Sequence, residues 1–318
     1  MSEPTVKGRF APSPTGRMHL GNISTALLSW LSVKSRGGEW LLRIEDLDPQ
    51  RSRLEWSQWI EDDLSWLGLM WDEGGLADRG SAGPYSQSRR GDIYSQYLER
   101  LRTMGAVYPC CCRRRDILAT QAPHQTDGRV VYSGRCRPEG AGHAVIDEKA
   151  FQGRSTRLFV GDARIPFVDG LFGAQSVSLA RECGDFILRR ADGAWAYQLA
   201  VVVDDALMGV TEVARGCDLL LSAAQQIYLF GLLGYPAPAY YHLPLIGNEA
   251  GQRLCKRDPQ ADMSHLRERF TPGQLLGLIA NMLGLAPTPD ATTLERLLAG
   301  FSWDKVPRAD MLRCPDLS

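Results

Sequence analysis

The first 70 residues alternate between short apolar runs and helical patterns, and this alternation restricts the possible folds more than any other feature. Residues 5–10 and 40–44 are typical of strands, whereas 23–35 and 54–67 place apolar side chains at helical spacing. A segment rich in proline, 11–16, separates the first strand from the first helix and suits neither element. Strands that alternate with helices predict an α/β fold with a parallel sheet.

The same alternation returns further along the chain after an interruption of about 80 residues that is rich in turns. The remaining expected elements are helices at 85–104, 219–233, 260–270, 272–284 and 292–300, and strands at 186–189, 200–203 and 242–246. With 318 residues the chain has room for about two domains, so we expect the interruption to be an insertion in one nucleotide-binding domain. The expected segments are 1–105 (first half of that domain), 106–185 (insertion), 186–258 (second half) and 259–318 (helical C-terminal region).

Charge and hydropathy exclude several classes of protein. The net charge of −1 gives no overall basic footprint for nucleic acid or for an anionic membrane, so any RNA contact must come from local patches. The polar N-terminus does not resemble a signal peptide, and no stretch approaches 18 uninterrupted apolar residues. We therefore expect a cytoplasmic protein without a membrane contact, and we expect it to be a monomer.

The loop after the first expected strand has features of a phosphate-binding site. His19, Gly21 and Asn22 lie where this loop enters the first helix. A helix N-terminus offers unpaired N–H groups and a positive dipole end to phosphate, and glycine lets a nucleotide approach the backbone. His19 can donate to a phosphate oxygen on which charge grows in the transition state. Taken alone, so short a motif is more often a proline-rich turn that carries an incidental histidine, but its place between a strand and a helix favours a phosphate site.

Longer motifs in this part of the chain resemble the class I glutamyl-tRNA synthetases. The first signature is Arg9-Phe-Ala-Pro-Ser-Pro-Thr-Gly16 followed by His19-Leu-Gly-Asn22, with Asn22 where the wider class often has a second histidine. Further similar motifs are Arg43-Ile-Glu-Asp46, Tyr197-Gln-Leu-Ala-Val-Val-Val-Asp-Asp205, Gly209-Val-Thr-Glu-Val-Ala-Arg-Gly216 and Asp218-Leu-Leu220. The resemblance implies a Rossmann-type class I aminoacyl-tRNA synthetase catalytic domain that uses ATP with Mg²⁺, with His19, Gly21 and Asn22 at the ATP.

A second signature of that family is a loop whose lysine binds ATP. Here the loop is Arg253-Leu-Cys-Lys-Arg257, and Lys256 aligns with the family's lysine. A compact ammonium suits pyrophosphate, on which charge builds as it leaves. The sequence departs from the family pattern at Arg253, which replaces a lysine, and at Cys255, which replaces a small hydroxyl residue. The resemblance makes His19 and Lys256 the expected catalytic residues.

Glutamate has two carboxylates and one ammonium, so its pocket needs cations and an anion. Arg9 and Arg215 are the candidate carboxylate partners, because a guanidinium offers a planar fork, and Glu45 is the candidate ammonium partner. Tyr197 and Ser13 add hydroxyl groups. Surface salt bridges would explain the same residue types. The resemblance places all five at glutamate-binding positions, together with Phe10, Ala11 and Pro12.

Clustered cysteines in the insertion predict a metal site. Cys110, Cys112 and Cys136 provide three thiolates, which favour zinc, and a closed zinc site has four ligands. From spacing alone the fourth ligand could be His124 or Cys111, and buried cysteines without a metal are the alternative. The resemblance extends to a zinc site that uses Tyr132 as the fourth ligand. It implies a structural Zn²⁺ that holds the insertion facing the tRNA acceptor end.

Only about 60 residues follow the lysine loop, which is too few for the anticodon-binding region of a full glutamyl-tRNA synthetase. The chain therefore resembles a truncated branch of the family. This resemblance implies that L-glutamate is activated with ATP without tRNA and is then transferred to the queuosine base of tRNA(Asp). Two alternatives are a shortened ligase that charges the 3′ end and an inactive RNA-binding paralogue.

Overall fold

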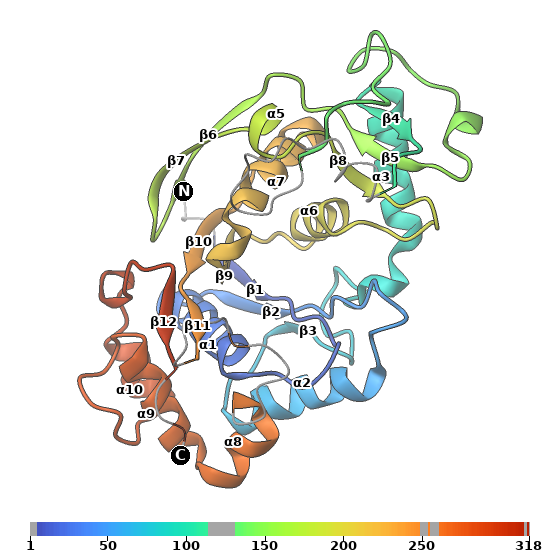
Figure 1. Ribbon diagram of the computed structural model, residues 1–318. Coiled ribbons are helices and arrows are strands. Elements are labelled where there is room, and N and C mark those ends of the chain that lie inside the picture. The colour runs from blue at the N-terminus through green and yellow to red at the C-terminus, as the bar shows by residue number, and fades with distance from the viewer. Residues whose placement is uncertain (1–4, 114–130, 249–253, 255–260, 315–316, 318) are drawn as a thin grey trace.

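The computed structural model describes residues 5–113, 131–248, 254, 261–314 and 317, and Figure 1 shows how they are arranged. A seven-stranded sheet forms the centre, in the order β3-β2-β1-β9-β10-β6-β7. Its strands are β1 (Lys7–Phe10), β2 (Glu39–Leu42), β3 (Glu73–Gly74), β6 (Arg164–Asp169), β7 (Gly173–Ser178), β9 (Glu212–Gly216) and β10 (Ala239–Leu243). Neighbouring strands are parallel except β6 and β7, which form an antiparallel hairpin. The predicted α/β fold with a parallel sheet is confirmed.

The strand order reverses next to β1. From β1 the chain passes through α1 to β2 on one side, whereas β9 and β10 extend the sheet on the other side. In parallel sheets, ligands bind at the carboxyl ends of strands where the order reverses. Close packing supports this arrangement, because a β-carbon at Gly8 would lie 2.4 Å from Cγ2 of Val33 on α1. The position of a ligand site is thus set by topology.

Helices cover the large sheet and continue into the C-terminal region. They are α1 (Leu20–Lys34), α2 (Leu54–Trp66), α3 (Gly91–Thr103), α5 (Leu179–Glu182), α6 (Tyr197–Leu207), α7 (Leu220–Leu233), α8 (Met263–Arg269), α9 (Pro272–Met282) and α10 (Leu294–Ala299). The last three, orange to red in Figure 1, lie beside α1 and α2, and α9 shares one apolar core with α1. A short parallel pair, β11 (Leu245–Gly247) with β12 (Met311–Arg313), ties this region to the sheet domain. Within the described chain, no helix combines the length and apolarity that crossing a membrane requires.

A second, three-stranded sheet forms the far end of the molecule from α8, α9 and α10 (Figure 1). It consists of β4 (Val107–Cys110), β5 (Ser155–Leu158) and β8 (Phe186–Arg189). The small sheet and the large sheet each contain strands from both sides of residue 185. β8 follows the expected boundary at 185 but joins the small sheet, whereas the hairpin of β6 and β7 precedes that boundary and joins the large sheet.

The expected strand at 200–203 is wrong, because this segment lies inside α6. Its side chains from Leu199 to Asp205 are all buried, so the helix has no polar face in this part that would mark a helical period. Pro244 lies between β10 and β11, which divides the single strand expected at 242–246. The helix expected from residue 85 begins at Gly91, after a 3₁₀ turn, η1 (Gln87–Arg89).

Candidate active site

A cavity of about 430 Å³ opens beside the carboxyl ends of β1 and β9. It is lined by all predicted glutamate and ATP residues that the structure describes: Arg9, Phe10, Ala11, Pro12, Ser13, His19, Gly21, Asn22, Glu45, Tyr197 and Arg215. Lys256, with Arg253 and Cys255, lies outside the described residues, although Leu254 lines the cavity. Side chains that are far apart in the sequence therefore meet in one place, at the edge of the sheet that the topology favours for a ligand.

The proline-rich loop after β1 runs alongside the chain that follows β2. The N–H groups of Arg43 and Glu45 donate to the carbonyls of Phe10 and Pro12, each over 3.0 Å. Pro12 has no N–H to donate, and here only its carbonyl is used. The ring of Phe10 stacks on Trp40, with ring centroids 6.1 Å apart. These contacts fix the loop backbone next to Glu45.

His19 forms the N-cap of α1 with its side chain. Its Nδ1 accepts the N–H of Gly21 over 3.1 Å, and Oδ1 of Asn22 accepts the N–H of His19 over 3.1 Å, which completes a capping box. Because Nδ1 is an acceptor here, the proton of a neutral ring lies on Nε2. A β-carbon at Gly21 would lie 3.0 Å from Cε1 of His19, so glycine leaves the room that the ring occupies.

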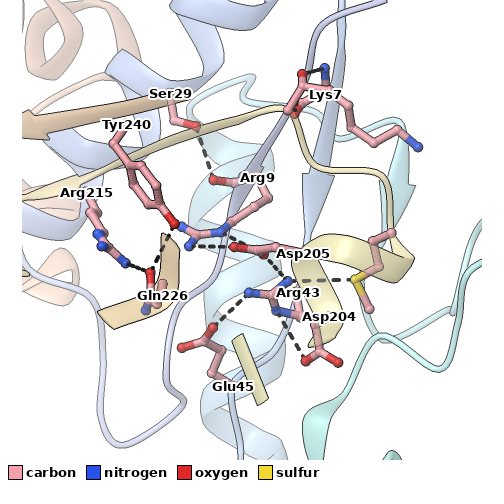
Figure 2. Close-up of polar contacts among 12 residues, drawn as sticks. Lys7, Arg9, Ser29, Arg43, Glu45, Asp204, Asp205, Arg215, Gln226 and Tyr240 are labelled. Atoms are coloured by element: carbon pink, nitrogen blue, oxygen red, sulfur yellow. Dashed lines mark hydrogen bonds and ion pairs between the residues drawn. The ribbon is translucent and has the colours of Figure 1, made fainter. Parts of the chain in front are cut away.

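Buried acids of α6 hold three arginines in what we call the Asp204–Asp205 network: Arg9, Arg43, Glu45, Arg90, Asp204 and Asp205. Figure 2 labels all of these residues except Arg90. Nη1 of Arg43 lies 2.6 Å from Oδ1 of Asp205, and Nη2 lies 3.1 Å from Oε1 of Glu45. Nε of Arg9 lies 3.3 Å from the same oxygen of Asp205. Arg90 approaches Asp204 to 2.6 Å. Each guanidinium of the network thus has at least one carboxylate partner.

Burial and ion pairing set the charges of this network. Burial acts to raise the pKa of Asp205, but Arg9 and Arg43 outweigh it and hold that pKa below its ordinary value. Glu45 differs, because burial raises its pKa although Arg43 and Arg9 favour the carboxylate. A cation arriving in the cavity would offset the burial of Glu45. Glu45 is therefore suited to accept an ammonium group.

Arg215 lies among neutral partners, which we call the Arg215 group: Arg215, Tyr197, Gln226, His242 and the carbonyl of Leu219. Nη1 donates to Oε1 of Gln226 over 2.7 Å, and Nε donates to Nε2 of His242 over 3.1 Å. The hydroxyl of Tyr197 lies 3.4 Å from Nη1, and the carbonyl of Leu219 lies 3.3 Å from Nη2. Arg215 is only 4% exposed, and no ion pair joins it to a carboxylate in the described part of the chain. A buried guanidinium without an anion favours an anionic ligand.

Arg43, Asp204 and Asp205 lie in motifs that carry the family resemblance, but no separate role was predicted for them. Gln226 and His242 were not predicted as site residues. Two adjacent acids in an apolar segment are a usable signal, because buried carboxylates need cations. Gln226 and His242 have no such signal in a single sequence.

The predicted metal ligands lie together beside the small sheet. The sulfurs of Cys110, Cys112 and Cys136 all lie within 4.8 Å of one another, and those of Cys112 and Cys136 are 3.5 Å apart. The hydroxyl of Tyr132 lies 3.5 Å from the sulfur of Cys110 and 3.9 Å from that of Cys112. In a tetrahedral zinc site with bonds of about 2.3 Å, sulfurs lie roughly 3.8 Å apart. The donors therefore fit a zinc ion.

The thiol of Cys136 has the chemistry of a metal ligand. Burial opposes its ionisation, but hydrogen bonds from the Cys111 backbone and from Tyr132 outweigh burial and lower the pKa of Cys136 to about 6. Zinc binds thiolates, so this shift favours a metal site. Cys111 is exposed, and its sulfur lies 3.7 Å from that of Cys136. His124, the other alternative, lies outside the described residues.

Comparison with known proteins places this geometry in one family. Residues 5–292 match the model of the catalytic domain of class I tRNA synthetases (E and Q). The chain is similar to the glutamyl-Q tRNA(Asp) synthetase of Nitratidesulfovibrio vulgaris, with 45% identity over 89% of this chain and 87% of that protein. The enzyme of the same name from Symbiobacterium thermophilum is 44% identical over 95% of this chain and 94% of its own.

Solved structures agree with the sequence comparison. A glutamate tRNA ligase from Elizabethkingia meningosepticum, in complex with its amino acid, superimposes with a TM-score of 0.81 at 30% identity. The match covers 98% of this chain and 67% of that ligase. The fold thus has a close counterpart among solved structures.

Proposed function

This chain belongs to the family of class I tRNA synthetases (E and Q), and on that premise we propose that it activates L-glutamate with ATP and transfers it to the queuosine base of tRNA(Asp). Membership makes it an enzyme, a ligase of the aminoacyl-tRNA synthetase type. The relatives named glutamyl-Q tRNA(Asp) synthetase support the acceptor. We further propose that the activation step needs no tRNA.

The observation that supports glutamate as the substrate is the buried charge of Arg215, which forms an ion pair with no carboxylate among the described residues. Arg215 and Tyr197 line the cavity together, and we assign them to the side-chain carboxylate of glutamate. Glu45, whose carboxylate gains from a nearby cation, is assigned to the ammonium group. Arg9 and the loop from Phe10 to Ser13 complete the pocket. An amide substrate such as glutamine would leave the charge of Arg215 without an anion.

In the first step, an oxygen of the α-carboxylate attacks the α-phosphate of ATP. The bond between the α- and β-phosphates breaks, which yields glutamyl-adenylate and pyrophosphate. The N-terminus of α1, with Gly21 and Asn22, can bind phosphate oxygens, and His19 can donate from Nε2. Lys256 is assigned to the leaving pyrophosphate by its place in the sequence motif. Mg²⁺, as the usual companion of ATP, supplies further charge neutralisation.

In the second step, a hydroxyl of the queuosine cyclopentene ring attacks the carbonyl carbon of the adenylate. An ester bond forms, AMP leaves, and the hydroxyl proton is released. The role of the protein in both steps is to position the reactants and to stabilise charge.

A glutamate-dependent exchange of pyrophosphate into ATP, measured without tRNA, tests the activation step. We expect exchange with glutamate and little with glutamine. Transfer of labelled glutamate is then compared on tRNA(Asp) with and without queuosine, and only the modified tRNA should be labelled. Labelling of queuosine-free tRNA would indicate a ligase for the 3′ end. No exchange with either amino acid would indicate an inactive RNA-binding paralogue.

Cys110, Cys112, Tyr132 and Cys136 are proposed to hold a structural Zn²⁺. Cys136→Ser is expected to lose bound zinc, because serine does not provide the thiolate that zinc prefers. Metal analysis of the purified variant measures this, with the half-buried Cys314 replaced in Cys314→Ser as a control cysteine outside the proposed ligand set. Full zinc occupancy in Cys136→Ser would remove Cys136 from the ligand set.

A further inference from the structure

Behind Arg215, two more buried residues continue the chain of hydrogen bonds away from the cavity. We propose that Asp169 and His242 form a dyad that positions the guanidinium of Arg215 for the side-chain carboxylate of the substrate and so sets the preference for glutamate over glutamine. This inference rests on the proposed function and assigns a role to residues that do not line the cavity. Asp169 and His242 are therefore positioning residues.

Three neighbouring strands place the residues in line. Arg215 on β9 and His242 on β10 are directly paired in the sheet, and Asp169 ends β6 on the other side of β10. Nδ1 of His242 lies 2.6 Å from Oδ2 of Asp169, and its Nε2 accepts from Nε of Arg215 over 3.1 Å. His242 and Asp169 are 0% and 1% exposed, so water does not compete for these bonds.

The chemistry of the two outer groups fixes the protonation of the central ring. A guanidinium can only donate hydrogen bonds, and an ionised carboxylate can only accept them. His242 must therefore carry its proton on Nδ1, toward Asp169, and present the lone pair of Nε2 to Arg215. Burial lowers the pKa of His242, and with the nearby charge of Arg215 it outweighs Asp169 and the Leu219 backbone, which act to raise that pKa. The imidazole is thus a neutral acceptor with one allowed tautomer.

Asp169 is itself anchored by the backbone. Its Oδ1 accepts the N–H groups of Leu171 and Phe172 over 3.0 and 2.9 Å, and its Oδ2 accepts the N–H of His242 over 3.2 Å. Burial opposes its charge, but His242 and the N–H of Phe172 outweigh burial and lower the pKa of Asp169. A carboxylate held in this way keeps the ring in one orientation.

The dyad aligns Arg215 without neutralising it. The partners of Arg215 within hydrogen-bond distance are an imidazole, an amide oxygen, a phenol and a peptide carbonyl, and the ring of Tyr240 lies 5.0 Å from its guanidinium carbon. A carboxylate in direct contact would also fix the side chain, but it would compete with the substrate carboxylate for the charge. A neutral acceptor behind the guanidinium fixes its direction and leaves the charge for the ligand.

Asp169→Asn tests the inference because it should change the tautomer of the His242 imidazole. An amide can donate to Nδ1, which shifts the ring proton to Nε2, where it faces the donor of Arg215. We expect the KM for glutamate in pyrophosphate exchange to rise roughly tenfold, which is the size of one charge-assisted hydrogen bond. The KM for ATP should stay within about twofold, and the ratio of glutamate to glutamine activity should fall, since only the carboxylate site is disturbed.

Two substitutions of His242 separate positioning from folding. His242→Leu removes the acceptor and should raise the glutamate KM as Asp169→Asn does. His242→Gln provides an amide oxygen as a new acceptor and should restore much of the affinity for glutamate. The exposed residues Asp162 and His265 give matched controls, Asp162→Asn and His265→Gln, which should leave both KM values unchanged. Calorimetric binding of glutamate and glutamine without ATP is measured on the same proteins.

The results distinguish this inference from the proposed function. If the wild type catalyses exchange but Asp169→Asn and His242→Leu keep the wild-type glutamate KM, the dyad has no positioning role. The same conclusion follows if both variants raise the KM values for glutamate, glutamine and ATP equally. If the wild type catalyses no exchange, the proposed function fails, and calorimetry still decides the inference. Glutamate that binds the wild type and the variants alike, or none of them, overturns it.

Discussion

Two clusters of side chains around buried arginines line or support the same cavity. They differ in whether carboxylates balance the positive charge of the arginine. In the Asp204–Asp205 network, Arg9, Arg43 and Arg90 each contact at least one buried carboxylate. In the Arg215 group, the guanidinium contacts only neutral acceptors within the described chain. A paired charge stabilises the structure around it, whereas an unpaired buried charge reduces stability until an anion binds.

The contrast separates support from recognition. Arg43 is 0% exposed, and it connects the acids of α6 to Glu45. Arg215 lines the cavity, and none of its partners in the described part of the chain is a carboxylate. Arg9 belongs to both descriptions, because it contacts Asp205 and also lines the cavity. The residue type alone therefore does not indicate whether an arginine supports the structure or recognises a ligand. The partners of its guanidinium indicate this.

The largest expected effect tests whether the Asp204–Asp205 network stabilises the fold. Arg43→Met should lower the free energy of unfolding by about 3–5 kcal/mol, because it leaves the buried carboxylates of Asp205 and Glu45 short of a cation. Urea unfolding measures the change. Arg164→Met, at an exposed arginine on β6, serves as the control and should alter stability by only about 0.5 kcal/mol. A loss below about 1 kcal/mol in Arg43→Met would contradict a structural role for the paired network.

The next largest effect tests whether Arg215 binds the side-chain carboxylate of the substrate. Arg215→Met should lower kcat/KM for glutamate roughly 100-fold, because the ligand carboxylate loses its buried cation. It should destabilise the fold less than Arg43→Met, since it leaves no carboxylate without a counter-charge. Pyrophosphate exchange and urea unfolding are measured on the same protein. An unchanged kcat/KM would place the carboxylate of the substrate elsewhere.

A smaller effect is expected when Arg215 is given a carboxylate partner like those in the Asp204–Asp205 network. Gln226→Glu puts a carboxylate where an amide oxygen now lies 2.7 Å from Nη1 of Arg215. The glutamate KM should rise roughly tenfold, because the new ion pair competes with the ligand. Gln225→Glu is the matched control, because Gln225 bonds to Gln198 and not to Arg215. Equal KM values for Gln226→Glu and the wild type would show that the charge of Arg215 is not reserved for the ligand.

The smallest effect is on the pH dependence of stability. The pKa of His242 is lowered from 6.5 in the folded protein, so below pH 6.5 the unfolded chain binds a proton that the folded one does not. Stability at this site is therefore lost as the pH falls through 6.5. Between pH 7 and 5.5 the wild type should lose about 1 kcal/mol more than His242→Gln. Parallel urea titrations at both pH values measure the difference, and identical losses would argue against a neutral, buried His242.

Sequence motifs located a loop that lines the cavity where the backbone itself is constrained. The prolines at 12 and 14 restrict the main chain, Gly16 adopts a positive φ of 149°, and Gly21 leaves room for the ring of His19, so the loop after β1 and the start of α1 could be located. The partners of Arg215 could not. Gln226 and His242 reach it from α7 and β10, and a single sequence does not contain the strand register that brings them together.

The wrong prediction of a strand at 200–203 also arises from tertiary contacts that a single sequence does not contain. Three consecutive valines favour a strand when considered locally. In the folded chain, however, α6 is buried along this stretch, and its two acids contact arginines from β1, from the segment after β2 and from the turn before α3. Tertiary packing and ion pairing decide the conformation there.

The strand order also has a consequence for the synthesis of the protein. β1 emerges from the ribosome early, yet its neighbour β9 begins at residue 212 and β10 ends at residue 243. Until Asp204 and Asp205 are made, Arg9 and Arg43 have no acids of α6 to contact. The nascent chain therefore lacks part of the cavity lining through most of its translation, and an interrupted product that stops before β9 has the loop after β1 but not Arg215, the residue that we propose to bind the side-chain carboxylate of the substrate.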